Sequence, residues 1–201
     1  MYVRTPVLDV PEDPVFTMTT LTVFNPPLRS LFYHGTSAEA ARSIQIDGFK
    51  ASKNDGDWLG DGVYFFDVRS RAEQWAKYYH RDASPTLITV EVDLSNCMDL
   101  SDQKWAQVLH RHADRLLTEA KHFGHPEIIQ NEVFHGKDSF VINSIADRLA
   151  NHGLKVSCVK GLFTSGDLAY PGSALALEAH VQLAVRNTEI ISIRAIEQLS
   201  E

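Results

Sequence analysis

A chain of 201 residues, 44% hydrophobic and 22% charged, has the size and composition of a globular protein with one sizeable core. Its net charge of −7 argues against a surface that binds nucleic acid non-specifically, because such a surface is basic. Two cysteines form no disulfide framework, no apolar run reaches the ~20 residues of a membrane span, and the N-terminus has no signal-peptide pattern, so we expect a cytoplasmic protein.

The beginning of the chain contains two candidate strands. Residues 1–29 are rich in proline and partly apolar, so we expect an N-terminal arm or first strand, with residues 17–24 favouring a strand through Thr, Val and Phe. The apolar run at residues 31–33 predicts the next strand, which should end at His34. Gly35 follows, and a residue without Cβ lets a ligand approach the backbone closely.

A helix and a polar loop follow this strand. Small apolar residues at helical spacing predict a helix over residues 37–47, with a hydroxyl residue as its N-terminal cap and Gly48 as its left-handed end. Residues 50–61 are rich in glycine and aspartate and predict a loop. The aromatic run at residues 62–66 then predicts a strand that carries Tyr64.

The rest of the chain alternates between helical and strand patterns. Apolar residues recur at helical spacing in three stretches: 69–79, from 101 or 102 to about 121, and from 138 or 139 to Gly153. Four stretches predict strands: 86–93, 155–159, 178–186 and 190–196. Residues 123–137 are irregular, and residues 161–173 predict a second polar loop. Without repeats or a linker, we expect residues 1–201 to form a single domain.

Three features in a fixed order carry a resemblance to a known family. They are the triplet HGT at His34, a helix of small residues that ends in Gly-Phe, and the run LGDGVYFF around Tyr64. This order resembles the diphtheria-toxin and poly(ADP-ribose) polymerase group of ADP-ribosyltransferases, which has a His in its first motif, a Tyr in its second and usually a Glu in its third. The wording WLGDGVYFF is similar to bacterial members, often toxins or phage-defence proteins.

The resemblance places the third motif in the predicted strand at residues 178–186. The run QLAVRNTEII has the layout of that motif and puts Gln182 where the group has Glu. Gln accepts a hydrogen bond but carries no negative charge. Strand alternation puts Glu178 and His180 on the same face as Gln182, so Glu178 is a second candidate for the catalytic role. An amphipathic strand with a solvated polar face is the alternative interpretation.

The resemblance implies an α+β fold in which split, strongly bent β-sheets form a cleft for NAD and are flanked by helices. It also implies roles for the first two motifs. His34 would hydrogen-bond the adenosine ribose, and the backbone of Gly35, beside Thr36 in the same motif, would pair with the nicotinamide carboxamide. Tyr64 would stack on the nicotinamide ring.

Two further cofactor contacts follow from spacing within the family. In the polymerases a second stacking aromatic follows the Tyr by eleven residues, which gives Trp75 here. Trp offers a flat stacking surface, although a core anchor is an equal interpretation of Trp75. The small hydroxyl residue that contacts the carboxamide in the family falls at Ala72, and Ser70 is the nearby candidate.

The resulting hypothesis is an NAD-dependent mono-ADP-ribosyltransferase. Its acceptor is unknown, whether protein or nucleic acid, and an antitoxin or immunity protein is a possible partner. The alternatives are an NAD- or ADP-ribose-binding module without catalysis and an NAD glycohydrolase. We expect no metal site, because the Gly/Asp loop lacks the spacing of a calcium loop and the histidines, His135 among them, read as solvated.

Overall fold

The computed structural model describes residues 28–200 except 55–56, 125–127, 129, 132–133 and 165. The predicted strand at residues 17–24 and nearly all of the predicted arm lie outside the described residues. The elements in chain order are β1 (Arg29–Ser37), α1 (Ala38–Asp47), β2 (Val63–Phe66), α2 (Arg69–Tyr79), the 3-10 helix η3 (Arg81–Ala83), β3 (Pro85–Asp93), β4 (Cys97–Asp99), α3 (Gln103–His122), α4 (Gly136–Asn151), β5 (Cys158–Phe163), β6 (His180–Val185), the 3-10 helix η4 (Thr188–Ile190) and β7 (Ile191–Gln198).

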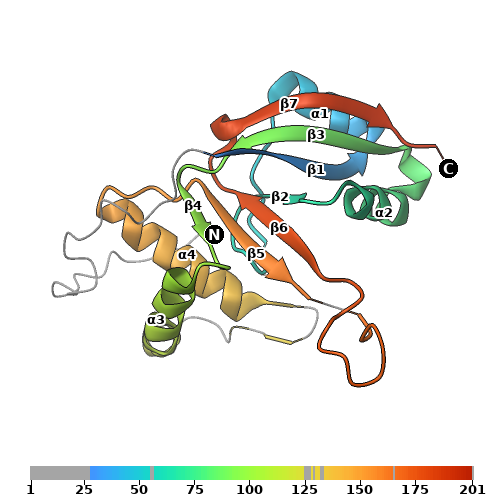
Figure 1. The fold of residues 1–201 in the computed structure, drawn as a ribbon. Coiled ribbons are helices and arrows are strands. Elements are labelled where there is room, and N and C mark those ends of the chain that lie inside the picture. Colours follow the sequence, from blue (N-terminus) through green and yellow to red (C-terminus); the bar gives the residue numbers. More distant parts are fainter. Residues whose placement is uncertain are drawn as a thin grey trace.

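The strands form one sheet in the order β4-β5-β6-β2-β1-β3-β7, which opens between β2 and β1. Strand β1 pairs with β3 along its whole length, but it pairs with β2 only at Tyr33 and Phe66. The two parts of the sheet therefore diverge, with β1, β3 and β7 on one side and β4, β5 and β6 on the other (Figure 1). This bent, split sheet with its flanking helices confirms the predicted α+β class.

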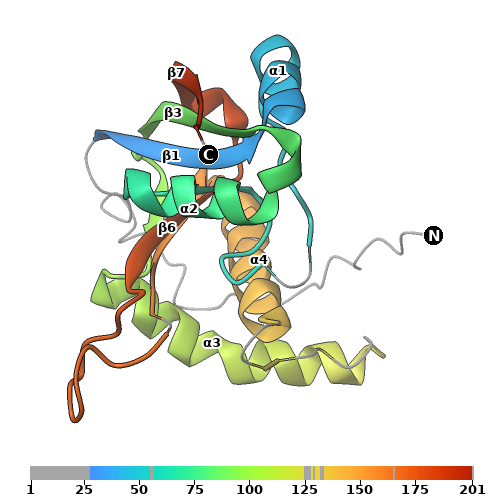
Figure 2. The ribbon, with the colours of Figure 1, turned by 90° about the vertical axis from the view of Figure 1, so that its right-hand side faces the viewer.

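Each part of the sheet has its own helices, and the buried apolar residues form two cores, the first of which also includes residues of β4, β5 and β6. Helices α1 and α2 pack against the β1–β3 part, and α3 and α4 pack together beside the β4–β5–β6 part (Figures 1 and 2). The first core centres on Phe32, Phe65 and Ile88, and the second on α4 residues such as Ile142 and Ile145. None of the helices within the described part of the chain is both long and apolar enough to cross a membrane.

The regular spacing of apolar residues predicts the bounds of the helices accurately, except for the start of α4. Helix α2 has the predicted bounds, and Ser37 caps α1 by accepting a hydrogen bond from the Ala40 N–H at 3.2 Å. Gly48 ends α1 with φ of +77°, but its ψ of 175° is extended rather than left-handed. Helix α4 begins at Gly136, earlier than predicted, and the side chain of Asp138 accepts a hydrogen bond from Gln130 instead of capping the helix.

Two strand predictions need correction. Strand β1 continues through the HGT triplet to Ser37, so His34 lies inside the strand and not at its end. Strand β5 lies at Cys158–Phe163 instead of residues 155–159, so Gly161 belongs to a strand and not to the predicted polar loop. Pairing with β6 along this stretch outweighs the low strand propensity of Lys160 and Gly161.

At Gly35, strand β1 comes close to the backbone of α2. A Cβ at Gly35 would lie 2.2 Å from the carbonyl oxygen of Ala72 and 3.0 Å from the backbone nitrogen of Ala76, well inside van der Waals contact. The missing side chain thus makes room for the backbone of α2. The sequence predicted only that a ligand could come close to the backbone at Gly35, and not this packing role.

We predict that Gly35→Ala lowers the free energy of unfolding by about 3 kcal/mol, because neither backbone can move aside without disturbing the sheet. Urea unfolding measures this loss. The matched control is Gly153→Ala, which has φ of +80° and no atom within 4 Å of an added Cβ, so it should cost only the strain of about 1 kcal/mol for a left-handed residue. An equal loss in the two variants would show that α2 does not depend on the missing Cβ.

Candidate active site

A pocket of about 910 Å³ lies where the sheet splits. This volume falls in the range of roughly 300–1,000 Å³ that is usual for small-molecule sites. Its walls come from β1, α1, the loop after α1, β2, α2, β5 and β6, together with the residue that precedes α4. Several predicted site residues line it, namely His34, Gly35, Tyr64, Trp75 and Gln182.

His34 joins β1 to β2 through its side chain. Its Nδ1 lies 2.8 Å from the carbonyl oxygen of Tyr64. A carbonyl only accepts, so Nδ1 carries the proton and Nε2 of the neutral ring remains an acceptor. The ring also contacts Phe49 and Phe65, each with ring centroids 5.5 Å away. Burial lowers the pKa of His34, and the nearby His80 lowers it further, although the bond to Tyr64 acts in the opposite direction.

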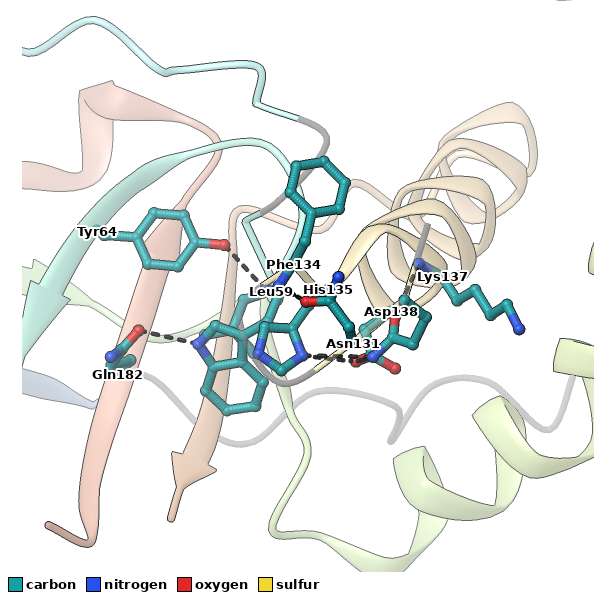
Figure 3. A network of polar contacts seen from close by, with 10 residues as sticks. Leu59, Tyr64, Asn131, Phe134, His135, Lys137, Asp138 and Gln182 are labelled. Atoms are coloured by element: carbon teal, nitrogen blue, oxygen red, sulfur yellow. Dashed lines mark hydrogen bonds and ion pairs between the residues drawn. The ribbon is translucent and has the colours of Figure 1, made fainter. Parts of the chain in front are cut away.

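Tyr64 fixes the loop that precedes β2. Its hydroxyl accepts a hydrogen bond from the Leu59 N–H at 2.9 Å (Figure 3). The same hydroxyl donates a hydrogen bond to the Gly60 carbonyl at 3.0 Å. Burial raises the pKa of Tyr64, and the negative charge of Asp57 raises it further. The phenol therefore stays protonated at neutral pH and does not act as a base.

Gln182 is held from two sides. Its Oε1 accepts a hydrogen bond from the Trp58 indole Nε1–H at 2.9 Å, which is the dashed line at Gln182 in Figure 3. Its Nε2 lies 2.9 Å from Nε2 of His180. His180 in turn lies 2.7 Å, at Nδ1, from the carbonyl oxygen of Glu178. The expected placement of His180 and Gln182 on one face is thus observed. Glu178 is exposed before β6, and its side chain is not part of the pocket wall.

Three other predicted contacts have different outcomes. Trp75 lines the pocket with 45% of its surface exposed, and its ring lies 4.2 Å from that of Tyr79, so it is not a buried core anchor. Thr36 is buried within β1, and Ser70 is exposed in the first turn of α2. Neither Thr36 nor Ser70 is part of the pocket wall.

The pocket also contains residues that sequence reasoning did not select. Among them are Trp58, Phe66, His135 and Phe163, of which Trp58 and Phe163 have ring centroids 5.4 Å apart. His135 belongs to the pocket wall, contrary to the solvated position expected from the sequence. A bulky indole amid small polar loop residues was the one signal that pointed to Trp58.

Helix α4 holds the loop from the other side. Asn143 accepts a hydrogen bond from the Asp61 N–H at 3.0 Å and donates one to the Asp61 carboxylate at 2.9 Å. Arg186, directly after β6, donates to the same Asn143 oxygen. The segment that carries Trp58 is therefore fixed by β2 through Tyr64 and by α4 through Asn143. Across the described part of the chain, no group of three or more His, Cys, Asp or Glu residues is placed to hold a metal ion.

Comparisons with known proteins identify the larger part of the chain. A family model described as the poly(ADP-ribose) polymerase catalytic domain matches residues 13–161, well over half of the sequence. This match contains His34 and Tyr64 and ends before β6, so Gln182 lies beyond it. An uncharacterised protein of Methanocaldococcus jannaschii, MJ0359, is 33% identical over 61 residues. That alignment covers 30% of this chain and 28% of the archaeal protein.

The lowered pKa of His34 predicts a pH-dependent contribution to stability. Below the unfolded value of 6.5 the unfolded chain binds a proton that the folded protein resists, so wild type loses stability as the pH falls below that value. His34→Asn keeps an amide donor but does not titrate. The difference in free energy of unfolding between wild type and His34→Asn, measured in urea, should therefore be smaller at pH 5.0 than at pH 7.5.

The matched control for this measurement is His110→Asn, on the exposed side of α3. This control makes the same substitution away from the pocket, so its change between the two pH values is the background for the His34→Asn change. A His34→Asn difference that changes with pH no more than this background would contradict the assignment of a neutral His34.

Proposed function

Because the chain belongs to the family of poly(ADP-ribose) polymerase catalytic domains, we propose that it is an NAD-dependent mono-ADP-ribosyltransferase. It would transfer single ADP-ribose units to a macromolecular acceptor and release nicotinamide. The observation that carries this proposal is one pocket lined by His34, Tyr64 and Gln182, which come from β1, β2 and β6. Its volume of about 910 Å³ is compatible with a dinucleotide that lies partly in solvent.

The proposed roles of the residues follow the family pattern. The neutral His34 offers Nε2 as an acceptor for a ribose hydroxyl of the adenosine half. The Gly35 backbone pairs with the nicotinamide carboxamide, and Tyr64 and Trp75 supply the aromatic surfaces for its ring. Gln182 binds the 2′-hydroxyl of the nicotinamide ribose through its amide.

The reaction is a displacement at the anomeric carbon. The bond between this carbon and the nicotinamide nitrogen breaks, and the nitrogen keeps the electron pair. A bond from the acceptor oxygen or nitrogen forms on the opposite face, and the acceptor loses its proton to solvent. Charge develops on the ribose in the transition state, as in glycoside hydrolysis. The chain orients the substrate and excludes water, and Gln182 contributes a dipole where the family usually has a charge.

One observation favours a second candidate function. Gln182 carries no negative charge, and both of its amide groups already have hydrogen-bond partners in the protein. A module that binds NAD or ADP-ribose without catalysis needs no carboxylate at this position. Hydrolysis of NAD without an acceptor is the third possibility and shares the same pocket.

We also propose that residues 1–201 form a single domain that acts as a bacterial toxin or phage-defence effector in the cytoplasm. The support is the similarity of the segment WLGDGVYFF to such proteins. An antitoxin or immunity protein is the partner that this role implies.

Incubation with NAD labelled in the adenylate part tests the proposed reaction. We expect labelled macromolecule and free nicotinamide, and NAD should raise the melting temperature as a ligand of the folded state does. His34→Ala and Tyr64→Ala should abolish this shift. Gln182→Ala should lower nicotinamide release by about 100-fold and leave the NAD affinity nearly unchanged, because the lost contact acts mainly in the transition state.

Glu178→Gln is the matched control, since Glu178 lies outside the pocket wall. It should release nicotinamide at close to the wild-type rate, whereas an inactive Glu178→Gln would assign the catalytic role to that carboxylate. Binding without nicotinamide release would favour the non-catalytic module, and release without labelled macromolecule would favour the glycohydrolase.

The length of the product is a separate prediction. An amide accepts a hydrogen bond but cannot act as a general base that removes the proton of a ribose hydroxyl. Gln182 therefore does not support growth of a polymer. We expect only single ADP-ribose units on the acceptor, measured by mass spectrometry of the modified material. A ladder of long chains on a gel would contradict this prediction.

A further inference from the structure

The hydrogen bonds around Gln182 run in one fixed direction. The indole of Trp58 only donates, so the amide oxygen of Gln182 must face it. The amide nitrogen must then face His180 and donate to its Nε2. His180 therefore carries its single proton on Nδ1, which agrees with its 2.7 Å contact to the Glu178 carbonyl oxygen. Each of these three hydrogen bonds then joins a donor to an acceptor, which leaves one orientation of the Gln182 amide.

A glycine on the neighbouring strand makes room for the first member of this chain. Gly161 of β5 lies directly opposite Gln182 of β6. A Cβ at Gly161 would lie 2.8 Å from one ring carbon of Trp58 and 2.9 Å from a methyl carbon of Leu59. The indole that bonds Gln182 therefore packs directly against the backbone of Gly161. Gly161 has no positive φ, so the space for the indole, and not backbone strain, is what this glycine provides.

We propose that Trp58 and His180 are positioning residues that hold the Gln182 amide in one orientation toward the substrate ribose. Trp58 can do so because it packs against Gly161. Their bonds use one lone pair of Oε1 and one hydrogen of Nε2. The second lone pair and the second hydrogen are the groups that the amide presents to a ligand. An acceptor and a donor side by side match a pair of neighbouring hydroxyls, such as the 2′- and 3′-hydroxyls of a ribose. This inference rests on the proposed function.

The same chain explains why an amide suits this position. A carboxylate at residue 182 would keep the bond from Trp58 but would turn a second acceptor toward Nε2 of His180, which is itself an acceptor. In this arrangement a carboxylate would lose the hydrogen bond that the amide donates to Nε2 of His180. The ring of His180 itself lies between Phe66 and Phe163, with centroids 5.2 Å from each.

The first experiment examines the hydrogen bond without NAD. In nitrogen-15 NMR the indole N–H of Trp58 should exchange with solvent about tenfold more slowly in wild type than in Gln182→Leu, a factor that matches a hydrogen bond of ordinary net strength. The His180 ring should show the tautomer with its proton on Nδ1. Equal exchange rates in the two proteins would overturn the inference whatever the enzyme does.

The second experiment measures nicotinamide release. Trp58→Phe keeps an aromatic ring against Phe163 and deletes the indole N–H, so kcat should fall about tenfold while KM for NAD changes less than about twofold. The matched control is Trp105→Phe, which makes the same change in the core between α3 and α4. It should lower the melting temperature and leave kcat and KM unchanged.

Gly161→Ala reaches the same bond from the other strand and should reproduce the effect of Trp58→Phe on kcat. The double variant should be no slower than the slower single variant, because both changes break the same hydrogen bond, the one between Trp58 and Gln182. Additive losses, or a Trp58→Phe enzyme with wild-type kcat, would overturn the positioning role while nicotinamide release by wild type would still support the proposed function. A wild type that releases no nicotinamide would refute the proposed function itself, and with it the catalytic part of this inference.

Discussion

A hydrogen bond from the His34 ring to the Tyr64 carbonyl stands where backbone pairing between β1 and β2 ends. A carbonyl left unpaired inside a protein costs about 1–3 kcal/mol, so a sheet does not open unless something replaces the lost partner. The imidazole is that replacement, and it holds the two parts of the sheet together while they diverge. The pocket that contains Tyr64, Trp75 and Gln182 exists because the sheet opens here.

Local periodicity accounts for the parts of the fold that the sequence predicts well. Helix α2 is predicted to the residue and α3 within two residues, because their apolar spacing is regular and, in α3, the side chain of Asp102 caps the first turn. Strand β5 is displaced because its middle, Lys160-Gly161, has a poor strand pattern and is set in place by pairing with β6. Strand β4 is only three residues long, Cys97–Asp99, which is too short for a pattern of alternation to be visible.

The candidate site divides in a similar way. Motif order was enough to bring His34, Tyr64 and Gln182 together, since each carries a recognisable neighbourhood in the sequence. The bond between Trp58 and Gln182 spans 124 positions, and no local pattern indicates it. The family spacing falls at Ala72, and Ser70, the nearby hydroxyl residue, lies on the exposed side of the first turn of α2. Spacing along a helix places a residue only if the face that it occupies is also known.

The packing of Trp58 against Gly161 limits which substitutions this protein can accept during evolution. Gly161, Trp58, Gln182 and His180 come from three segments, and each is suited to the other three. A substitution of Gln182 by Glu removes the hydrogen that the amide donates to Nε2 of His180, and a side chain at position 161 displaces the indole. The effect of a carboxylate at position 182 is therefore epistatic, because it depends on which residues stand at positions 58, 161 and 180. Residue 182 is thus constrained by hydrogen bonds to its neighbours in the protein.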